Sequence, residues 1–301
     1  MKCDLCPRKC LVDRKKGEKG ICGQTENLKV ARAALHFWEE PCISGDAGSG
    51  AVFFSGCPLH CVFCQNENIA NGTVGKEISL ERLVDIFLEL QEKRANNINL
   101  VTPGHFVPQI VKALDQARRE GLTLPVVYNT SSYETVDTIK MLEGYVDIYL
   151  PDFKYMSPVL SKKYSHAPDY AEVAKAAIAE MVRQTGKAVF VNGDEDNLIL
   201  SGTIVRHLTL PGCMADSMQI LKYLHETYGD MIYISIMNQY TPVFEQKEYT
   251  ELNRCVTRRE YEKVLDYAFE LGIENGFFQD GETARESFIP AFDYEGVRKM
   301  P

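Results

Sequence analysis

The segment Phe53–Asn66, with the sequence FFSGCPLHCVFCQN, brings three cysteines together within a short loop. Cys57, Cys61 and Cys64 are separated by three and then by two residues, so they offer three thiolates at close spacing. A [4Fe-4S] cluster is normally held by four thiolates. Three thiolates without a nearby fourth therefore predict one iron that is left open, as a catalytic metal site leaves one position open for its substrate. The apolar run Ala51–Phe54 predicts a strand that leads into this loop.

Two other interpretations of the three cysteines are less favoured. Structural cysteines rarely fall this close together in a sequence, and zinc sites more often combine paired cysteine hooks with histidine. The alternative that stays open is a zinc ion with His60 as a further ligand. Phe63 lies between two of the cysteines, where we expect it to shield the bound group from water.

The spacing Cys-x3-Cys-x2-Cys after a Phe-Phe-x-Gly strand, followed by Gln65 and Asn66, resembles the radical S-adenosylmethionine (SAM) superfamily. More narrowly, it resembles the activating enzymes of glycyl-radical enzymes, in the branch of the pyruvate formate-lyase activating enzyme homologues. The resemblance implies that SAM chelates the open iron and that one electron from the cluster cleaves its sulfonium. It also implies that the resulting 5′-deoxyadenosyl radical abstracts a hydrogen atom. The cofactor supplies this chemistry, and the protein orients it.

Composition is that of a globular protein, and it excludes several classes of function. The chain has 301 residues, of which 25% are charged and 45% hydrophobic, enough for one main domain with an appendage. Its 33 basic and 42 acidic residues give a net charge of −9, which argues against a nucleic-acid partner. No apolar run approaches the length of a membrane span, and the N-terminus lacks a signal-peptide pattern. Ten cysteines at ligand spacings then predict metal sites in a reducing cytoplasm.

Helical and strand patterns alternate from about Ile78 onward. The expected strands are Asn99–Thr102, Val126–Asn129, Val146–Leu150, Ala188–Asn192, Ile204–Leu210 and Met231–Met237. The expected helices are one that follows Ser79, then Val107–Glu120, Glu134–Leu142, Tyr170–Thr185, Ser217–Tyr228 and Arg258–Leu271.

Repeated strand–helix units with apolar strands predict an α/β fold with a parallel sheet and outer helices. The pattern alone leaves a doubly wound sheet open. The resemblance implies a partial (β/α)6 TIM-like barrel with a small Cys-rich N-terminal extension. We expect this metal-binding extension over residues 1–48, and the barrel with a C-terminal tail over residues 49–301.

Charged residues at two expected strand ends are candidates for SAM binding, because the chemistry of such barrels sits at the carboxyl ends of the strands. Asp152 and Lys154 are two residues apart, so on an extended segment they share a face. Lysine suits a carboxylate, and aspartate suits an ammonium or a ribose hydroxyl. An isolated pair of this kind would indicate a solvated ion pair, but the segment resembles the Asp-x-Lys of the activases, which binds SAM.

Arg206, followed by Pro211 and Gly212, resembles another activase strand, which implies contact with the methionine carboxylate. Without the motif, a salt bridge on the barrel rim is the alternative.

The chain departs from the family pattern at two strand ends. Where many radical SAM proteins have Gly-Gly-Glu-Pro for the methionine amino group, this chain has Thr-Pro-Gly-His, and we expect Thr102 and the backbone near Gly104 to accept from the ammonium. Asn129 stands where the pyruvate formate-lyase activase has an acidic residue for a monovalent cation, so Asn129 and Ser131 are expected to hydrogen-bond SAM instead. Gln239 lies in the segment where the activases face the adenosine.

Four further cysteines form a separate cluster near the N-terminus. They are Cys3, Cys6, Cys10 and Cys22, in a basic segment punctuated by glycine. Four thiolates close the coordination shell of either Zn²⁺ or a second iron–sulfur cluster, and soft ligands do not separate the two. The sequence therefore predicts a metal site that is structural, that passes electrons to the main cluster, or that contacts a protein.

These features favour an iron–sulfur oxidoreductase that cleaves SAM and activates a glycyl-radical enzyme. Radical modification of a small molecule or peptide is the alternative within the same chemistry, and an iron–sulfur electron-transfer protein is the alternative outside catalysis. The expected partners are a glycyl-radical enzyme or another protein or peptide substrate, and an electron donor such as flavodoxin or ferredoxin. We expect neither a nucleic acid nor a membrane as a partner.

Overall fold

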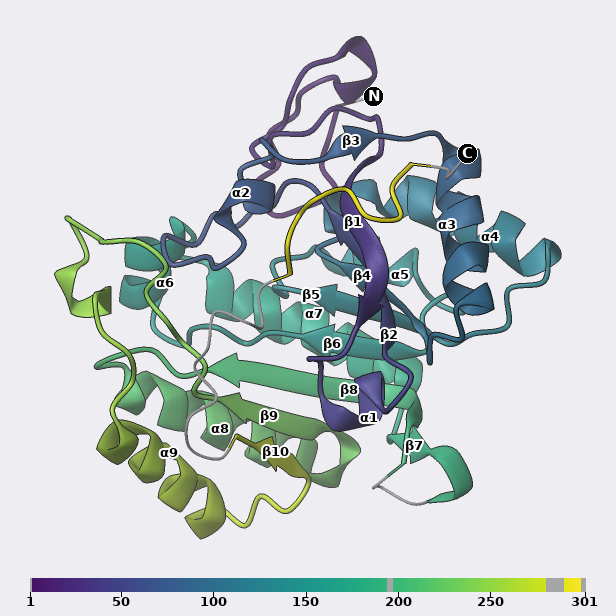
Figure 1. The fold of residues 1–301 in the computed structure, drawn as a ribbon. Helices are drawn as coiled ribbons and strands as arrows, with labels where there is room; N and C mark the ends of the chain where they lie inside the picture. Colours follow the sequence, from purple (N-terminus) through teal and green to yellow (C-terminus); the bar gives the residue numbers. More distant parts are fainter. Residues whose placement is uncertain (1, 194–196, 280–289, 299–301) are drawn as a thin grey trace.

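The computed structural model describes residues 2–193, 197–279 and 290–298. It confirms the expected α/β class, because helices pack along a mostly parallel sheet and the Cys-rich N-terminal loops stand at one end of it (Figure 1). The strands are β1 (Lys29–His36), β2 (Ser49–Phe54), β3 (Lys76–Glu77), β4 (Ile98–Val101), β5 (Val126–Thr130), β6 (Ile148–Pro151), β7 (Val189–Phe190), β8 (Ile199–Leu208), β9 (Tyr233–Met237) and β10 (Gly276–Phe278). The helices are α1 (Pro41–Ser44), α2 (Glu67–Ala70), α3 (Leu80–Glu92), α4 (Val107–Arg119), α5 (Val136–Lys140), α6 (Pro158–Ser165), α7 (Tyr170–Thr185), α8 (Met214–Tyr228) and α9 (Arg258–Glu270).

The order of strands in the sheet separates a partial barrel from a doubly wound sheet. The order is β10-β9-β8-β6-β5-β4-β2-β1-β3, and neighbours from β2 to β10 run parallel. A doubly wound sheet reverses its strand order at a switch point. From β2 to β10 the parallel strands lie in the sheet in the same order as in the chain. Crossover connections between parallel strands have the same hand, so such a sheet curves in one direction. The fold is therefore an open, partial TIM-like barrel.

The central strands and the helices form where the sequence pattern predicts burial. Every residue of β2, β4, β5 and β6 is buried, as expected for parallel strands covered on both faces. Ser79 caps α3 by accepting a hydrogen bond from the Arg82 backbone, and Thr257 with Glu260 forms a capping box at the start of α9. These caps explain why both helices begin at the expected residue.

Residues 188–192 do not form a barrel strand, which corrects one expectation. Only Val189 and Phe190 are extended, and β7 pairs antiparallel with β8 away from the main path of the sheet. Val189 is exposed while Phe190 is buried, so this short apolar run covers the sheet on one side only. The barrel strand is β8, which begins at Ile199, ahead of the expected Ile204.

Strands β1 and β10 extend the sheet at its two sides beyond the expected elements. β1 pairs antiparallel with β2, so residues 29–36 of the extension are part of the sheet. β10 pairs parallel with β9 at the other edge. Residues 280–289 of the expected C-terminal tail lie outside the described residues. None of the helices in the described ranges is long and apolar enough to cross a membrane.

Candidate active site

The three-cysteine loop follows β2 directly, at the carboxyl end of a fully buried strand. Gly56 begins the loop with a φ of +93°, a conformation that glycine adopts without strain. A Cβ at this position would lie 2.4 Å from the carbonyl oxygen of Cys22, so no larger residue fits between the loop and residues 2–24, the N-terminal lobe. The Val62 amide donates to the Tyr164 carbonyl at 2.8 Å, which ties the loop to α6.

Phe63 anchors the loop from inside. Its ring meets the rings of Tyr155, Tyr164 and Tyr240 edge to face, with centroids 6.1 to 6.3 Å away, and only 8% of the residue is exposed. Edge-to-face aromatic pairs add stability beyond the area that they bury. Phe63, which we expect to shield the group bound by the cysteines, is thus part of a buried aromatic cluster.

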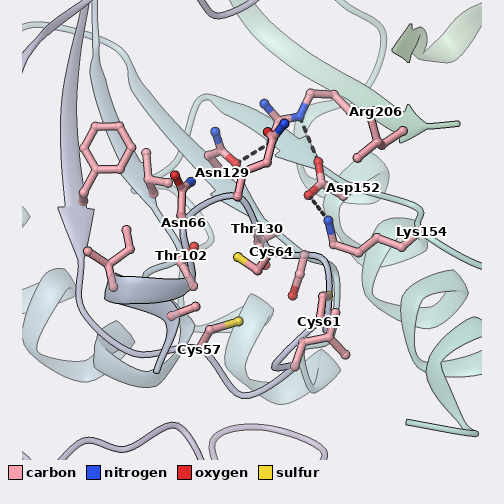
Figure 2. A pocket seen from close by; sticks show the side chains of 18 of the residues that line it. Cys57, Cys61, Cys64, Asn66, Thr102, Asn129, Thr130, Asp152, Lys154 and Arg206 are labelled. Atoms are coloured by element: carbon pink, nitrogen blue, oxygen red, sulfur yellow. Dashed lines mark hydrogen bonds and ion pairs between the residues drawn. The ribbon is translucent and has the colours of Figure 1, made fainter. Parts of the chain in front are cut away.

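All three cysteines line one cavity of about 240 Å³. Figure 2 shows the Cys57 and Cys64 sulfurs pointing into the same space, with the polar strand ends opposite them. Seven of the eight expected SAM-binding residues also line this cavity: Thr102, Asn129, Ser131, Asp152, Lys154, Arg206 and Gln239. The structure therefore brings together residues from five strands or strand ends around the cysteine loop.

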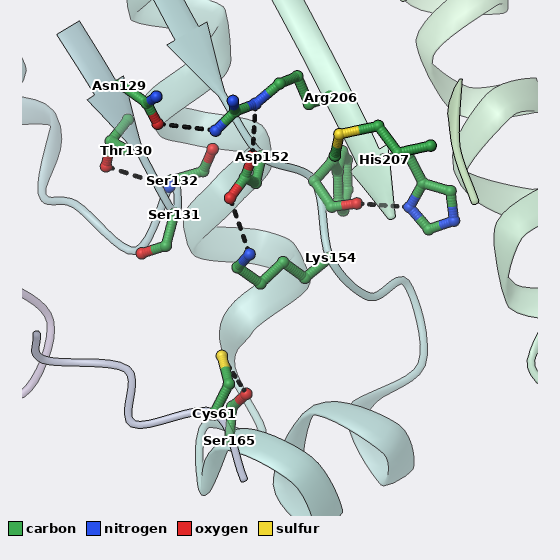
Figure 3. Close-up of polar contacts among 12 residues, drawn as sticks. Cys61, Asn129, Thr130, Ser131, Ser132, Asp152, Lys154, Ser165, Arg206 and His207 are labelled. Atoms are coloured by element: carbon green, nitrogen blue, oxygen red, sulfur yellow. Dashed lines mark hydrogen bonds and ion pairs between the residues drawn. The ribbon is translucent and has the colours of Figure 1, made fainter. Parts of the chain in front are cut away.

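A network of charged and amide side chains forms the wall of the cavity across β5, β6 and β8 (Figure 3). Arg206 donates from Nε to Asp152 Oδ1 at 2.9 Å and from Nη2 to Asn129 Oδ1 at 2.7 Å. Lys154 Nζ donates to Asp152 Oδ2 at 2.7 Å. Asp152 thus joins both cations and fixes their position at the ends of two neighbouring strands.

The charges in this network stabilise one another despite burial. Burial opposes ionisation of Asp152, but Arg206 and Lys154 outweigh it and hold the pKa of Asp152 below its usual value. Burial also opposes the charge of Lys154, and the carboxylate of Asp152 outweighs it, so the pKa of Lys154 is raised. Both groups are therefore charged at neutral pH, with Lys154 on the side of the network that faces Cys61.

Glu39 belongs to this network although sequence reasoning did not place it there. It accepts from Arg206 Nη1 at 2.9 Å and from Asn129 Nδ2 at 3.2 Å, and it lines the same cavity. Burial raises the pKa of Glu39, while Arg206 opposes the shift. Glu39 precedes α1, 90 residues before Asn129 and 167 before Arg206 in the chain. No local pattern marks it, since only the fold brings it to the barrel interior.

Thr102 and Gly104 have different positions relative to the cavity. Thr102 lines the cavity and has a φ of +55°, which is rare for a β-branched residue. Strained residues of this kind cluster at ligand sites. Gly104 is not among the residues that line the cavity, so the expected contact of the backbone near it with SAM stays a prediction. A Cβ on Gly104 would lie 2.3 Å from the Glu134 carboxylate, so its small size serves packing against that side chain.

The structure brings two of the N-terminal cysteines to one spot. A Cβ on Gly20 would lie 3.1 Å from the Cys10 sulfur and 3.4 Å from the Cys22 sulfur, so both thiols flank this glycine. Cys6 is buried, and burial raises the pKa of its thiol to about 12. Cys3 lies beside Arg14, whose Nη1 is 4.0 Å from its sulfur.

Burial affects the thiols of the main loop. It raises the pKa of Cys57 to about 11 and that of Cys64 to about 12, because it disfavours the charged thiolates. Among the described residues, no three His, Cys, Asp or Glu side chains are close enough together to hold a single ion. His60 points elsewhere, with Nε2 at 2.7 Å from the Ile21 carbonyl oxygen, so the geometry does not support zinc with His60 as a ligand.

Sequence comparison matches part of this chain to a known protein family. Residues 51–197 match the family model of the radical SAM superfamily. The uncharacterized protein MJ0674 of Methanocaldococcus jannaschii is 27% identical over 281 residues, which cover 90% of this chain and 75% of that protein.

Among solved structures, SuiB of Streptococcus suis has a similar fold. SuiB bound to S-adenosylmethionine gives a TM-score of 0.51 at 15% identity, covering 75% of this chain and 49% of that one. SuiB bound to the precursor peptide SuiA gives 0.50 at 14% identity, covering 75% and 47%. The chain thus spans about half the length of these solved chains, and the likeness concerns the fold.

The radical SAM family implies a [4Fe-4S] cluster and SAM as cofactors. The residues of the cavity fit both groups, because three soft thiols face one side of it and charged and amide side chains face the other. The match also begins at β2 and continues past Lys154, so it includes the cysteine loop and most of the polar wall. Residues 51–197 therefore match the radical SAM superfamily in sequence, and the residues that line the cavity fit its cofactors.

Proposed function

We propose that this chain is an enzyme in which Cys57, Cys61 and Cys64 hold a [4Fe-4S] cluster and the polar wall of the cavity binds SAM. When bound, the cluster supplies the single electron that cleaves the sulfonium of SAM reductively, so that hydrogen is then abstracted from a substrate. One observation carries the proposal: the three thiols and the Asp152–Lys154–Arg206 network line the same cavity.

The structure supports distinct roles for the two cations. The three nitrogens of the Arg206 guanidinium already donate to Asp152, Glu39 and Asn129. Within the described part of the chain, Lys154 Nζ makes one hydrogen bond, to Asp152. Because an ammonium has three donors, Lys154 has donors left for the methionine carboxylate of SAM, and Arg206 positions the groups around it. Thr102, Asn129, Ser131 and Gln239 supply the remaining polar contacts to SAM.

The hydrogen donor that we propose is a backbone glycine of a glycyl-radical enzyme. The pattern of Asp152 and Lys154, followed by Arg206 ahead of Pro-Gly, supports this subfamily. The departures at Thr102 and Asn129 favour the second candidate, a peptide or small molecule that is modified directly. Deuterium in the true substrate should appear in 5′-deoxyadenosine, and transfer from a labelled peptide or metabolite but not from glycine would reject the activase assignment.

Cleavage of SAM tests the main proposal. The protein, reconstituted with iron and sulfide without oxygen and reduced with dithionite, should release methionine and 5′-deoxyadenosine. Cys61→Ala should abolish release and lower the bound iron, whereas Cys255→Ala, which changes an exposed cysteine, should alter neither. An intact cluster without release of either product would leave only an electron-transfer protein.

The N-terminal cysteines complete the proposal. Zinc or a second iron–sulfur cluster would draw together the thiols of Cys3, Cys6, Cys10 and Cys22, which are not close enough in this structure to hold an ion. Metal analysis of the wild type and of Cys6→Ala distinguishes the two metals and tests whether the cysteines bind either. Residues 1–48 then act as the metal-binding extension and residues 49–301 as the catalytic barrel. This division is functional, since β1 lies in the same sheet as β2. Reduced thiolates require a reducing compartment such as the cytoplasm, where flavodoxin or ferredoxin would be the electron donor.

A further inference from the structure

The N-terminal lobe, residues 2–24, has a charge opposite to that of the whole chain. It holds seven lysines and arginines and three acidic residues, a net charge of +4 with neutral thiols in a protein of net charge −9. Zinc held by the four thiolates would lower the charge of the lobe to about +2, which is still positive. The lobe stands at one end of the molecule (Figure 1). Five of its lysines are exposed: Lys2, Lys9, Lys15, Lys16 and Lys19. In the described ranges, only Lys15 among these five pairs with a carboxylate, Glu26, at 4.0 Å.

Exposed apolar side chains accompany these lysines. Leu11 is 51% exposed and Ile21 is 48% exposed, and each is the chain neighbour of a cysteine of the lobe. Apolar contacts surrounded by charges are typical of protein interfaces, where charge guides the encounter and apolar side chains form the contact. The lobe contains no aromatic residue, so it lacks the stacking platforms with which proteins bind single-stranded nucleic acid.

The lobe touches the loop of the three cysteines directly. Arg8 donates from Nε to the Pro58 carbonyl at 2.8 Å, and the Ile21 carbonyl lies 2.7 Å from His60 Nε2. His60 is the residue before Cys61 in the chain. One hydrogen bond therefore connects the half-exposed Ile21 to the neighbour of a proposed cluster ligand.

We infer that residues 2–24 form the docking surface for an acidic one-electron carrier protein, which reduces the enzyme through this lobe. The inference rests on the proposed function, because it takes the three-cysteine loop as the site that must be reduced. An acidic carrier is repelled by the overall negative charge and attracted by the lysines of the lobe, so the lobe selects its orientation. Redox partners of this kind form small, transient interfaces.

The test compares two reductants on the same variants. Lys15→Glu, Lys16→Glu and Lys19→Glu together reverse the charge of the lobe. Lys93→Glu, Lys222→Glu and Lys263→Glu make the same change in charge at exposed positions outside it, at the end of α3 and within α8 and α9. Each protein is reduced either with a reduced acidic ferredoxin or with dithionite, and bleaching of the iron–sulfur absorbance is followed at low and high salt.

With ferredoxin at low salt, the lobe variant should be reduced at least tenfold more slowly than wild type, because electrostatic steering changes association rates by about 10-fold or more. Added salt should slow the wild type, because it screens attraction, and should speed the lobe variant, because it screens repulsion. Reduction by dithionite should be equal in all three proteins, which also shows that the variants fold.

Two results would overturn the docking surface. One is an equal effect of the lobe and helix variants on reduction by ferredoxin. The other is an unchanged ferredoxin rate in the lobe variant together with tight binding of a single-stranded oligonucleotide to the wild-type lobe. Bleaching does not require SAM, so the docking surface can hold even where SAM is not cleaved, and failure of one proposal can be told from failure of the other.

Discussion

Substitution of Asp152 by asparagine tests the charged network on which the proposed SAM site depends. Asp152→Asn keeps the size of the side chain but removes the carboxylate that joins Arg206, at 2.9 Å, to Lys154, at 2.7 Å. Exposed ion pairs contribute about 0.2–1 kcal/mol, whereas removal of one partner from a fully buried pair costs about 3–5 kcal/mol. The Asp152 side chain is 16% exposed and that of Lys154 18%. We therefore expect the free energy of unfolding to fall by about 2–3 kcal/mol.

The pH dependence of this loss has a definite sign. The pKa of Asp152 is lower in the folded protein than in the unfolded chain, where it is about 3.9. Such an acid stabilises the fold above the unfolded pKa, and the stabilisation is lost as pH falls through the folded pKa. The difference between wild type and Asp152→Asn should thus be equal at about pH 7 and about pH 5, and it should shrink below about pH 4.

Urea unfolding of the metal-free protein under reducing conditions measures this difference, with circular dichroism as the signal. The matched control is Asp230→Asn, which breaks a Lys187–Asp230 pair of 2.6 Å whose side chains are 62% and 71% exposed. That change should cost little stability, because an exposed ion pair is screened by water. If Asp152→Asn costs no more than Asp230→Asn, or if its effect grows as pH falls, the network does not stabilise the site as argued.

Three further substitutions test the loop and its surroundings. Phe63→Ala should lower the free energy of unfolding in urea by about 3 kcal/mol, because three tyrosine rings lose their partner, while Phe269→Ala, at an exposed position, should change it little. Burial lowers the pKa of His105 to about 3. The unfolded chain therefore binds a proton at this residue below about pH 6.5, and the folded chain does not. Relative to His105→Gln, the wild type should lose about 2 kcal/mol of stability between about pH 7 and pH 5. Gly56→Ala should destabilise the protein by about 2 kcal/mol in thermal melting, because the new Cβ would approach the Cys22 carbonyl oxygen at a left-handed φ.

Each of these expectations has a contrary outcome. Equal losses for Phe63→Ala and Phe269→Ala would mean that the aromatic cluster does not anchor the loop. A stability difference between wild type and His105→Gln that stays constant with pH would place a proton on His105 in the folded state. An unchanged melting temperature for Gly56→Ala would show that the lobe and the cysteine loop separate easily.

Local pattern was enough to predict the parts of this protein that depend on neighbouring residues. The spacing of Cys57, Cys61 and Cys64 and the pair Asp152 and Lys154 follow from loop and strand geometry, which acts over a few residues. Most helices and central strands were expected for the same reason, since burial of one helix face or of both faces of a parallel strand leaves a periodic pattern. The run at residues 188–192 has an apolar pattern too, and it was misread because such short runs do not reveal which strand they pair with.

Tertiary structure alone decided which distant groups meet. Glu39 enters the site from 167 residues before Arg206, and no periodicity relates the two. The Glu134 carboxylate occupies the space beside Gly104, a contact that depends on how the two loops pack. The sequence by itself therefore determined the α/β class and the thiols at the end of β2, because these depend on short-range sterics and burial. The composition of the charged wall and the contact of the lobe with the cysteine loop depend on long-range packing, which only the folded chain specifies.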